Sequence, residues 1–210
     1  LPRLAVAAGW TLLLSGAAAL LAVAMALPVG VLAARYRSRA VAATESVAYL
    51  GQGLPGVVVG LALVFLSLVL VPALYQTAAV LVFGYAILFL PKALGATRTA
   101  VERVPVEAEE VARTLGRTPW STWWSVTAPQ AAPGVAAGGL LVAVTAMKEL
   151  PATLMLRPTG IDTLATRLWS QTSLGAFGAA APAALALLLL ACVPAALLVR
   201  ATAGVPGGER

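Results

Sequence analysis

Long uncharged runs separated by short polar segments set the pattern of this chain. The longest runs cover residues 4–34, 46–91, 118–147 and 168–199. A membrane-spanning helix needs about 20 apolar residues, so the first and last runs each predict one span. The first run is also longer than the roughly 7–15-residue apolar core of a signal peptide. It is therefore interpreted as a retained helix.

The two middle runs need to be divided further. Pro72 interrupts the second run, which predicts two spans, over 54–71 and 78–94. The third run opens with a polar, Trp-rich stretch that is typical of a membrane interface, and it predicts a span only from Pro133 to Leu150. The whole pattern predicts an all-α integral membrane protein with five transmembrane helices in a single domain, residues 1–210.

Composition and charge agree with this prediction. Hydrophobic residues make up 60% of the chain and charged residues 10%, whereas about 25% of residues are charged in soluble proteins. The net charge of +6 comes from basic residues spread among membrane-flanking loops, not from a basic surface interleaved with aromatic residues. We therefore expect a lipid bilayer, and no nucleic acid, as a partner.

The basic residues also predict an orientation. With five spans and an outer N-terminus, most of the 14 lysine and arginine residues fall on one side of the membrane. Basic loops are retained in the cytoplasm. The polar loop at residues 97–131 and the C-terminus are therefore predicted to be cytoplasmic.

Helix start signals are concentrated in that polar loop. Pro105 suits the first turn of a helix, where its missing N–H is not needed. Glu107, Glu109 and Glu110 follow it and place negative charge where the helix dipole favours it. Arg113 lies at i+4 from Glu109 and i+3 from Glu110, so it can pair on the same face. A short helix is predicted to begin near Pro105.

Stop signals follow at once. Gly116 is the residue type that ends helices in the left-handed conformation, so the helix should stop at Leu115 or Gly116. Thr118 can cap a second helix, and Pro119 suits its first turn. Two short helices with a sharp bend form a knob that can be presented to a partner. By these signals alone the loop could also be an ordinary amphipathic connector on the membrane surface.

Residue types needed for catalysis are scarce. The chain has no histidine, one cysteine (Cys192, within the last run) and two lysines, Lys92 and Lys148. Neither lysine lies in a Gly-x-x-x-x-Gly-Lys-Ser/Thr loop, so the chain has no P-loop of its own for ATP. Hydrolase and soft-metal sites lack their usual residue types. We expect neither catalytic nor metal-ligating residues.

Two further patterns have open interpretations. Lys148 and Glu149 form an ionisable pair at a predicted span end, where charge is costly unless it faces protein or water; they are either functional or a mutual ion pair that ends the helix. The Gly56/Gly60 and Gly134/Gly138 pairs allow close helix approach. Internal packing is favoured over a dimer interface for both pairs.

The polar loop resembles a known family motif. The EAA loop of ABC-importer permeases has Glu-Ala-Ala, three residues, Gly, nine residues and then Ile-x-Leu-Pro. Four residues of this chain fall in register with it: Glu110, Ala112, Gly116 and Pro129. Val111, Val126 and Ala128 replace apolar residues of the motif. The intact spacing favours the family reading over the membrane-surface connector.

A second segment resembles one branch of that family. Residues 148–158 read Lys-Glu-Leu-Pro-Ala-Thr-Leu-Met-Leu-Arg-Pro, and residues 162–166 read Asp-Thr-Leu-Ala-Thr. This amino-acid sequence is similar to that of ferric-iron importer permeases, and thiamine and phosphonate permeases share parts of it. The chain begins with Leu1, so we expect it to be part of a longer protein, such as the C-terminal half of a two-part permease.

The resemblance implies a transmembrane subunit of a binding-protein-dependent importer in the bacterial inner membrane. Its partners would be a cytoplasmic ABC ATPase dimer, a second transmembrane domain and an extracytoplasmic substrate-binding protein. ATP would bind to the ATPase, and this chain would bind no cofactor. Coupling to the ATPase is implied for Glu107, Glu110, Ala112, Arg113, Leu115, Gly116 and Pro129, with Ala112 keeping the approach close. The cargo path or outer gate is implied at Lys148, Glu149, Thr153 and Arg157.

Other classes remain as alternatives. A secondary carrier or channel without an ATPase could use the loop merely to close a pore. Such a protein has no reason to keep the spacing from Glu110 to Pro129. A membrane enzyme is disfavoured by the missing catalytic residue types. Ferric iron prefers oxygen ligands, and on the predicted outer side only Glu149 and Asp162 are acidic, so a binding protein is expected to hold the ion first.

Overall fold

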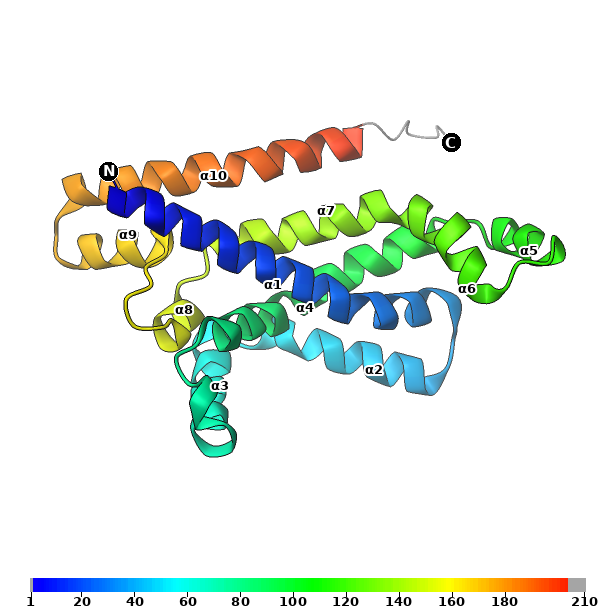
Figure 1. Cartoon of the computed structure of the whole chain (residues 1–210), viewed down its shortest axis with the longest axis horizontal. Helices are drawn as coiled ribbons and strands as arrows, with labels where there is room; N and C mark the ends of the chain where they lie inside the picture. Colours follow the sequence, from blue (N-terminus) through cyan, green and yellow to red (C-terminus); the bar gives the residue numbers. More distant parts are fainter. Residues whose placement is uncertain (1, 204–210) are drawn as a thin grey trace.

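Three long helices form the body of the molecule. The computed structural model describes residues 2–203, with side chains for residues 2–196, and this part is helical with connecting turns. Helices α1 (Pro2–Arg35), α4 (Ala78–Glu102) and α7 (Ala128–Met147) pack against one another. Helix α10 (Phe177–Ala203) lies along one side of this body (Figure 1). The all-α prediction is confirmed.

Small residues allow the three body helices to approach closely. Ala18, Ala22 and Ala26 recur at four-residue spacing on α1 and are completely buried. On α7, a Cβ added to Gly134 or Gly138 would lie 2.6 or 2.4 Å from an alanine Cβ of α4. Because such distances are too short for carbon atoms, these positions require glycine. Internal packing is thus confirmed for this glycine pair.

The helix predicted at 54–71 forms as α3, but it follows a sharp bend and is too short to span alone. Helix α2 (Arg39–Tyr49) runs back beside the body and continues as the 3₁₀ turn η1 (Leu50–Gly53). Helix α3 (Gly56–Leu70) then turns away by 107° and projects from the body (Figure 1). Glycines in η1 and Pro55 just before α3 explain the break, because proline cannot continue the hydrogen-bonding pattern of a helix. Helix α3 has 15 residues, fewer than the ~20 needed to span alone.

The predicted number of five spans is reached when one bent helix pair is counted as a crossing. Among the described residues, four helices are long and apolar enough to cross a membrane, or five if the bent pair α2–α3 counts as one crossing. After the 3₁₀ turn η2 (Pro72–Leu74), α4 replaces the predicted span at 78–94 and extends further, to Glu102. The C-terminal residues 204–210 lie outside the described residues.

Two other predicted boundaries also differ. The span predicted from Pro133 begins earlier, because α6 (Pro119–Thr122), a π-helical segment η3 (Trp123–Thr127) and α7 form one helix of 29 residues. It ends at Met147, before the predicted Leu150. The last apolar run is divided by Gly175, whose φ is +72°. Its first part forms the separate helix α9 (Leu164–Ser173).

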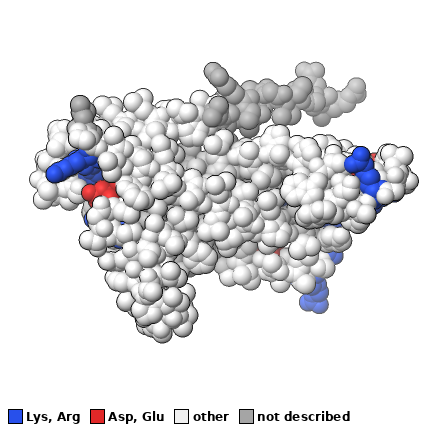
Figure 2. All heavy atoms as spheres, in the orientation of Figure 1, with Lys and Arg blue, Asp and Glu red and all other residues white. Residues whose placement is uncertain are grey.

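The polar elements occupy opposite ends of the long axis. Helix α5 (Val106–Thr114) lies at one end, whereas α9 lies at the other end and α8 (Pro151–Leu156) lies on the way to it (Figure 1). Lysine, arginine and acidic side chains gather toward these two ends on the face shown in Figure 2, and the middle of that face is almost entirely uncharged. Such a face is suited to lipid.

Candidate docking loop and intramembrane polar cluster

The polar loop folds as two short helices with a sharp bend. Helix α5 starts after Pro105, and Gly116 adopts a φ of +83°. Arg117 N–H donates to the Ala112 carbonyl at 3.1 Å, and Gly116 N–H donates to the Arg113 carbonyl at 2.9 Å. These two hydrogen bonds form a Schellman motif. The predicted bend at Gly116 is confirmed.

The second helix also starts as its sequence indicates. The Thr118 hydroxyl accepts a hydrogen bond from Ser121 N–H at 3.2 Å, and Pro119 occupies the first turn. Pro129 lies in the first turn of α7, directly after η3. The proline ring cannot donate a hydrogen bond to the preceding turn and crowds its carbonyl. This gives a physical reason for the wider π-helical turn before it.

A buried carboxylate fastens α5 to the rest of the chain. Glu109 is 6% exposed, and its Oε1 accepts hydrogen bonds from Arg35 of α1 at 2.6 Å and from the Thr127 hydroxyl at 2.8 Å. Arg113 lies 3.4 Å from its other oxygen. Glu109 was not among the predicted coupling residues, because sequence spacing does not reveal the distant partner Arg35.

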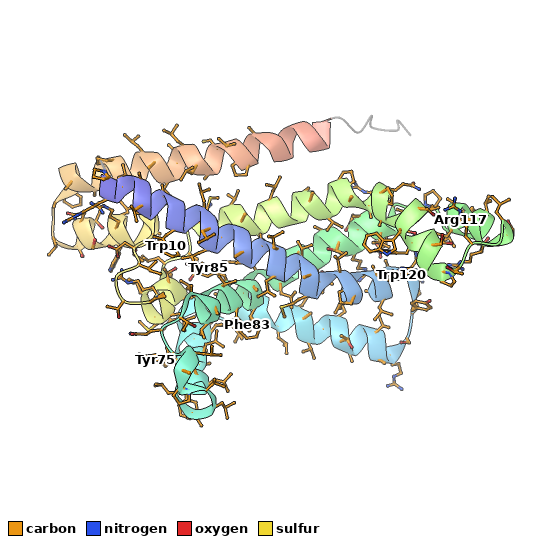
Figure 3. All side chains as sticks on the ribbon, in the orientation of Figure 1. Trp10, Tyr75, Phe83, Tyr85, Arg117 and Trp120 are labelled. Carbon is orange, nitrogen blue, oxygen red and sulfur yellow. The ribbon has the colours of Figure 1, made fainter. Side chains whose placement is uncertain are left out.

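The outer surface of the loop carries apolar and acidic side chains. Val111 and Leu115 are 59% and 78% exposed, and Glu107 and Glu110 are also exposed. Arg117 and Trp120 extend from the same end of the molecule (Figure 3). We refer to residues 106–120 as the docking loop. Its outward face is formed by Val106, Glu107, Glu110, Val111, Leu115 and Trp120.

Ala112 differs from its expected place. It is buried at 6% exposure, so it does not form part of a surface available to a partner. Helix α5 packs against α6 and η3, and the small side chain of Ala112 allows this approach. Ala112 therefore packs inside the docking loop, and its expected role in keeping a partner close stays a prediction.

A second group of polar residues lies between α4, α7 and α8. Lys92, which was expected near a span end, lies well inside α4. Its Nζ donates to the Thr145 hydroxyl of α7 at 3.3 Å and lies 5.1 Å from the centre of the Phe89 ring. Lys148 follows at the end of α7 and is exposed. We refer to Lys92, Thr145, Lys148 and Glu149 as the polar cluster.

Glu149 does not pair with Lys148. Its Oε1 accepts a hydrogen bond from Ala152 N–H at 3.0 Å, at the start of α8. The same oxygen lies 2.5 Å from the place of a Cβ on Gly56, at the start of α3. Glu149 thus joins the beginnings of α3 and α8. The mutual ion pair considered for Lys148 and Glu149 is not formed.

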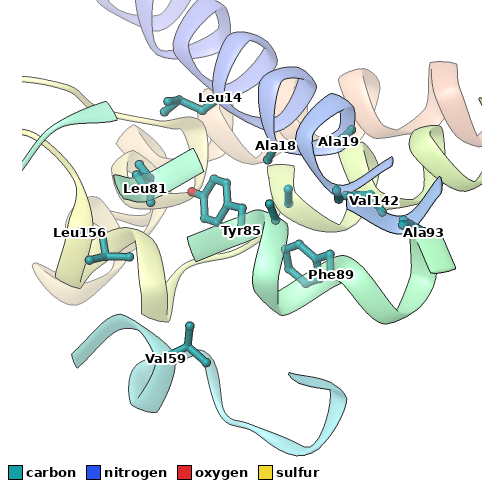
Figure 4. Packing of buried hydrophobic residues seen from close by; sticks show 14 of the residues in the cluster. Leu14, Ala18, Ala19, Val59, Leu81, Tyr85, Phe89, Ala93, Val142 and Leu156 are labelled. Carbon is teal, nitrogen blue, oxygen red and sulfur yellow. The ribbon is translucent and has the colours of Figure 1, made fainter. Parts of the chain in front are cut away.

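Thr153 and Arg157 are held by other contacts. Thr153 is completely buried, and its hydroxyl lies 2.5 Å from the Tyr85 hydroxyl of α4. The Tyr85 ring lies in the apolar core near Leu14 and Leu81 (Figure 4). Arg157 pairs with Asp162 and donates to the Ile161 carbonyl. Both residues stabilise the end of the molecule that holds α8.

Acidic side chains do not converge on a metal site in the described part of the chain. Among residues 2–203, no group of three or more His, Cys, Asp or Glu side chains could hold an ion. Asp162 is paired with Arg157, and Glu149 is bound at the start of α8.

Comparison with known proteins gives consistent matches. Residues 26–201 match the family described as binding-protein-dependent transport system inner membrane component. An Fe(3+)-transport system permease protein of Haemophilus influenzae, FbpB 2, is 40% identical over 89% of this chain, but the chain spans only 37% of that protein's length. A molybdenum transport system permease protein of Mycobacterium bovis, ModB, is 32% identical over 88% of the chain and 73% of its own length.

Solved structures have the same arrangement of helices. The inward-facing MetNI methionine ABC transporter matches with a TM-score of 0.76 at 17% identity, over 91% of this chain and 90% of that chain. An amino acid ABC transporter matches with a TM-score of 0.69 at 18% identity, over 94% of this chain and 92% of that chain. At these identities the likeness establishes the fold alone.

Proposed function

Because the chain belongs to the family of binding-protein-dependent transport system inner membrane components, we propose that it is the transmembrane subunit of an ATP-driven importer for ferric iron. Its partners are a cytoplasmic ABC ATPase dimer, a second transmembrane domain and an extracytoplasmic binding protein. ATP binds to the ATPase, and this chain supplies the path. The protein lies in the bacterial inner membrane with the docking loop in the cytoplasm.

The docking loop carries this proposal. A short helix with outward apolar side chains such as Val111 and Leu115 suits a helix-in-groove contact. The Schellman motif at Gly116 fixes the angle between α5 and α6. Glu110 stays exposed and makes no side-chain hydrogen bond within the described residues, so it is available to a partner.

Glu109 connects the docking loop mechanically to the long helices of the body. Arg35 ends α1, and Thr127 lies in η3, which leads directly into α7. A displacement of α5 by a closing ATPase dimer therefore acts on two body helices through one carboxylate. A buried charge cannot leave its partners cheaply, so α5, α1 and η3 move together.

Ferric iron is favoured as the cargo by the relatives. The 40% identical relative is named as an Fe(3+)-transport permease, and the 32% identical one as a molybdenum permease. The sequence of residues 148–166 resembles that of iron permeases. Molybdate, thiamine and phosphonate are the competing cargoes, and a carrier without an ATPase is the competing class.

Uptake by cells that produce the complete transporter tests the proposal. Radioactive ferric iron, molybdate and phosphonate are offered separately to cells with and without the gene for this chain. We expect iron uptake to require the chain and to stop when cellular ATP is depleted while the membrane potential is maintained. Uptake of molybdate alone would reject the cargo. Uptake that survives ATP depletion but stops with a proton ionophore would favour the carrier.

A further inference from the structure

The polar cluster holds two cations whose charges are not balanced within it. The ion pairs among the described side chains involve neither Lys92 nor Lys148. Lys92 donates to a neutral hydroxyl, that of Thr145. Lys148 is the first residue after α7, and its backbone N–H donates a hydrogen bond to the Thr145 carbonyl. Lys92 thus contacts the Thr145 side chain, and Lys148 contacts the same residue through its backbone.

The carboxylate of the cluster is already occupied. One Glu149 oxygen receives Ala152 N–H and lies against Gly56. The polar cluster contains two ammonium groups, those of Lys92 and Lys148, and one carboxylate, that of Glu149. The polar cluster therefore has a net positive charge.

The place of Lys92 on α4 indicates which surface it faces. A Cβ added to Gly95 of α4 would lie 3.4 Å from the hydroxyl of Tyr49 of α2. The neighbouring Ala96 packs against Gly138 of α7. Lys92 lies beside these two residues and is only partly buried. It therefore belongs to the strip of α4 between α2 and α7, and α1 covers a different side through Gly30 and Thr97.

Tyr49, which lies against Gly95 of that strip, also lines a groove. An open groove of about 470 Å³ between α2 and α4 is lined by Glu45, Ser46, Tyr49 and Arg98. Charged side chains at membrane depth face water or protein, because contact with lipid is costly. The middle of the face shown in Figure 2 is almost entirely uncharged and suits lipid contact. The strip with Lys92 is thus the side of α4 suited to a water-filled path.

We propose that Lys92 and Lys148 form a cationic binding point on the transport path and that the cargo passes it as an anion. This inference rests on the proposed importer function. A bare ferric ion carries three positive charges and is repelled by two ammonium groups. A ferric ion held by an anionic chelator, or an oxyanion, is attracted and can accept hydrogen bonds from both lysines.

The test uses the complete transporter in cells that lack other iron importers. Iron and its chelator carry different radioactive labels, with citrate and inorganic phosphate as alternative chelators, and molybdate is a separate arm. The variants are Lys92→Met and Lys148→Met, which remove charge, and Lys92→Arg, which keeps it. Arg39→Met is the matched control, because it removes an exposed cation of α2 outside the cluster. The amount of each variant in the membrane and its rate of ATP hydrolysis show that the transporter is assembled.

We expect the iron and chelator labels to enter in a constant ratio. Each Met variant should lower the initial rate of uptake about tenfold, which is the low end of the effect that a charged cleft has on substrate association. Lys92→Arg and Arg39→Met should retain most of the uptake. The inference is overturned if iron enters without the chelator, or if Lys92→Met or Lys148→Met transports normally. Lysine-dependent molybdate uptake without iron uptake would keep the anionic site and reject iron as the cargo. If nothing enters in an ATP-dependent way, the importer function itself fails.

Discussion

The docking loop and the polar cluster each contain a carboxylate bound within the chain, but the balance of charge around it differs. In the docking loop, Glu109 is buried and meets Arg35, with Arg113 at its edge. In the polar cluster, Glu149 is bound to a backbone N–H, and Lys92 and Lys148 have no carboxylate of their own. The buried carboxylate of the docking loop is neutralised, whereas the two lysines of the polar cluster are not.

This difference separates rigidity from recognition. A neutralised, buried ion pair fixes the position of α5 against α1 and η3. Unbalanced charge inside a membrane protein is costly and is kept where it acts on a ligand or an ion. The docking loop is therefore expected to respond to mutation mainly in assembly and coupling, and the polar cluster mainly in cargo uptake.

The largest effect is expected from breaking the buried pair of the docking loop. Arg35→Met leaves Glu109 buried without its main cation, which costs about 3–5 kcal/mol. Thermal unfolding of the purified transporter in detergent should show a large loss of stability, and ATP hydrolysis should no longer drive uptake. The double variant Arg35→Met with Glu109→Gln should be more stable than Arg35→Met alone, because the buried charge is then absent.

Arg113→Met is the matched control for this prediction. The Arg113 side chain is 52% exposed and lies at the longer distance of 3.4 Å from Glu109. Exposed ion pairs contribute about 0–1 kcal/mol. If Arg35→Met is no worse than Arg113→Met, Glu109 does not fasten the docking loop as described.

A smaller effect is expected at the bend of the docking loop. Gly116→Val places a β-branched residue at a φ of +83°, which costs about 1–2 kcal/mol. A Cβ there would meet nothing within 4 Å, so the cost is conformational and not steric. The protein should reach the membrane, but uptake per ATP hydrolysed should fall.

Gly116→Asn serves as the comparison, since asparagine tolerates the left-handed region better than valine. It should retain more coupling than the valine variant. Equal, normal uptake by both variants would mean that the fixed bend is not needed for transport.

The smallest effect on stability is expected in the polar cluster. Gly56→Ala puts a Cβ 2.5 Å from Glu149 Oε1, so the carboxylate must move from Ala152 N–H. Loss of this hydrogen bond costs about 1 kcal/mol, and the displaced carboxylate can then reach Lys148. Unfolding should change little, whereas uptake should fall because one cation is neutralised. Gly53→Ala is the control, because a Cβ at Gly53 meets nothing within 4 Å; equal uptake by the two variants would contradict the account.

Local signals predicted the docking loop well. Pro105, Gly116 and Thr118 act through backbone groups within a few residues of themselves, so their positions in the sequence are enough to define the two helices and the bend. Helix α2 had a signal of the same kind that was not used: the Ser38 hydroxyl accepts Val41 N–H at 3.2 Å. A serine N-cap after two closely spaced arginines could have revealed this helix.

Long-range contacts could not be read from the sequence. Glu109 and Arg35 are 74 residues apart, and Lys92 and Thr145 are 53 residues apart. Hydrophobicity located the apolar run that includes 54–71, but it could not show that Pro55 redirects α3 away from the body. The chemical character of the docking loop was therefore predictable, whereas its anchor and the composition of the polar cluster required the packing of α1, α4 and α7.

Crosslinking at Leu115 tests the central claim, that the docking loop contacts a separate ATPase, most directly. Cys192 is the protein's only cysteine, so Cys192→Ser gives a background in which Leu115→Cys is the single thiol. Leu115 is 78% exposed, and in the assembled transporter a thiol-reactive crosslinker should join it to the ATPase subunit, with ATP changing the yield. Thr44→Cys, on an exposed position of α2, should not crosslink. Free labelling of Leu115→Cys by an aqueous reagent, with no crosslinked product in the assembled transporter, would contradict the account.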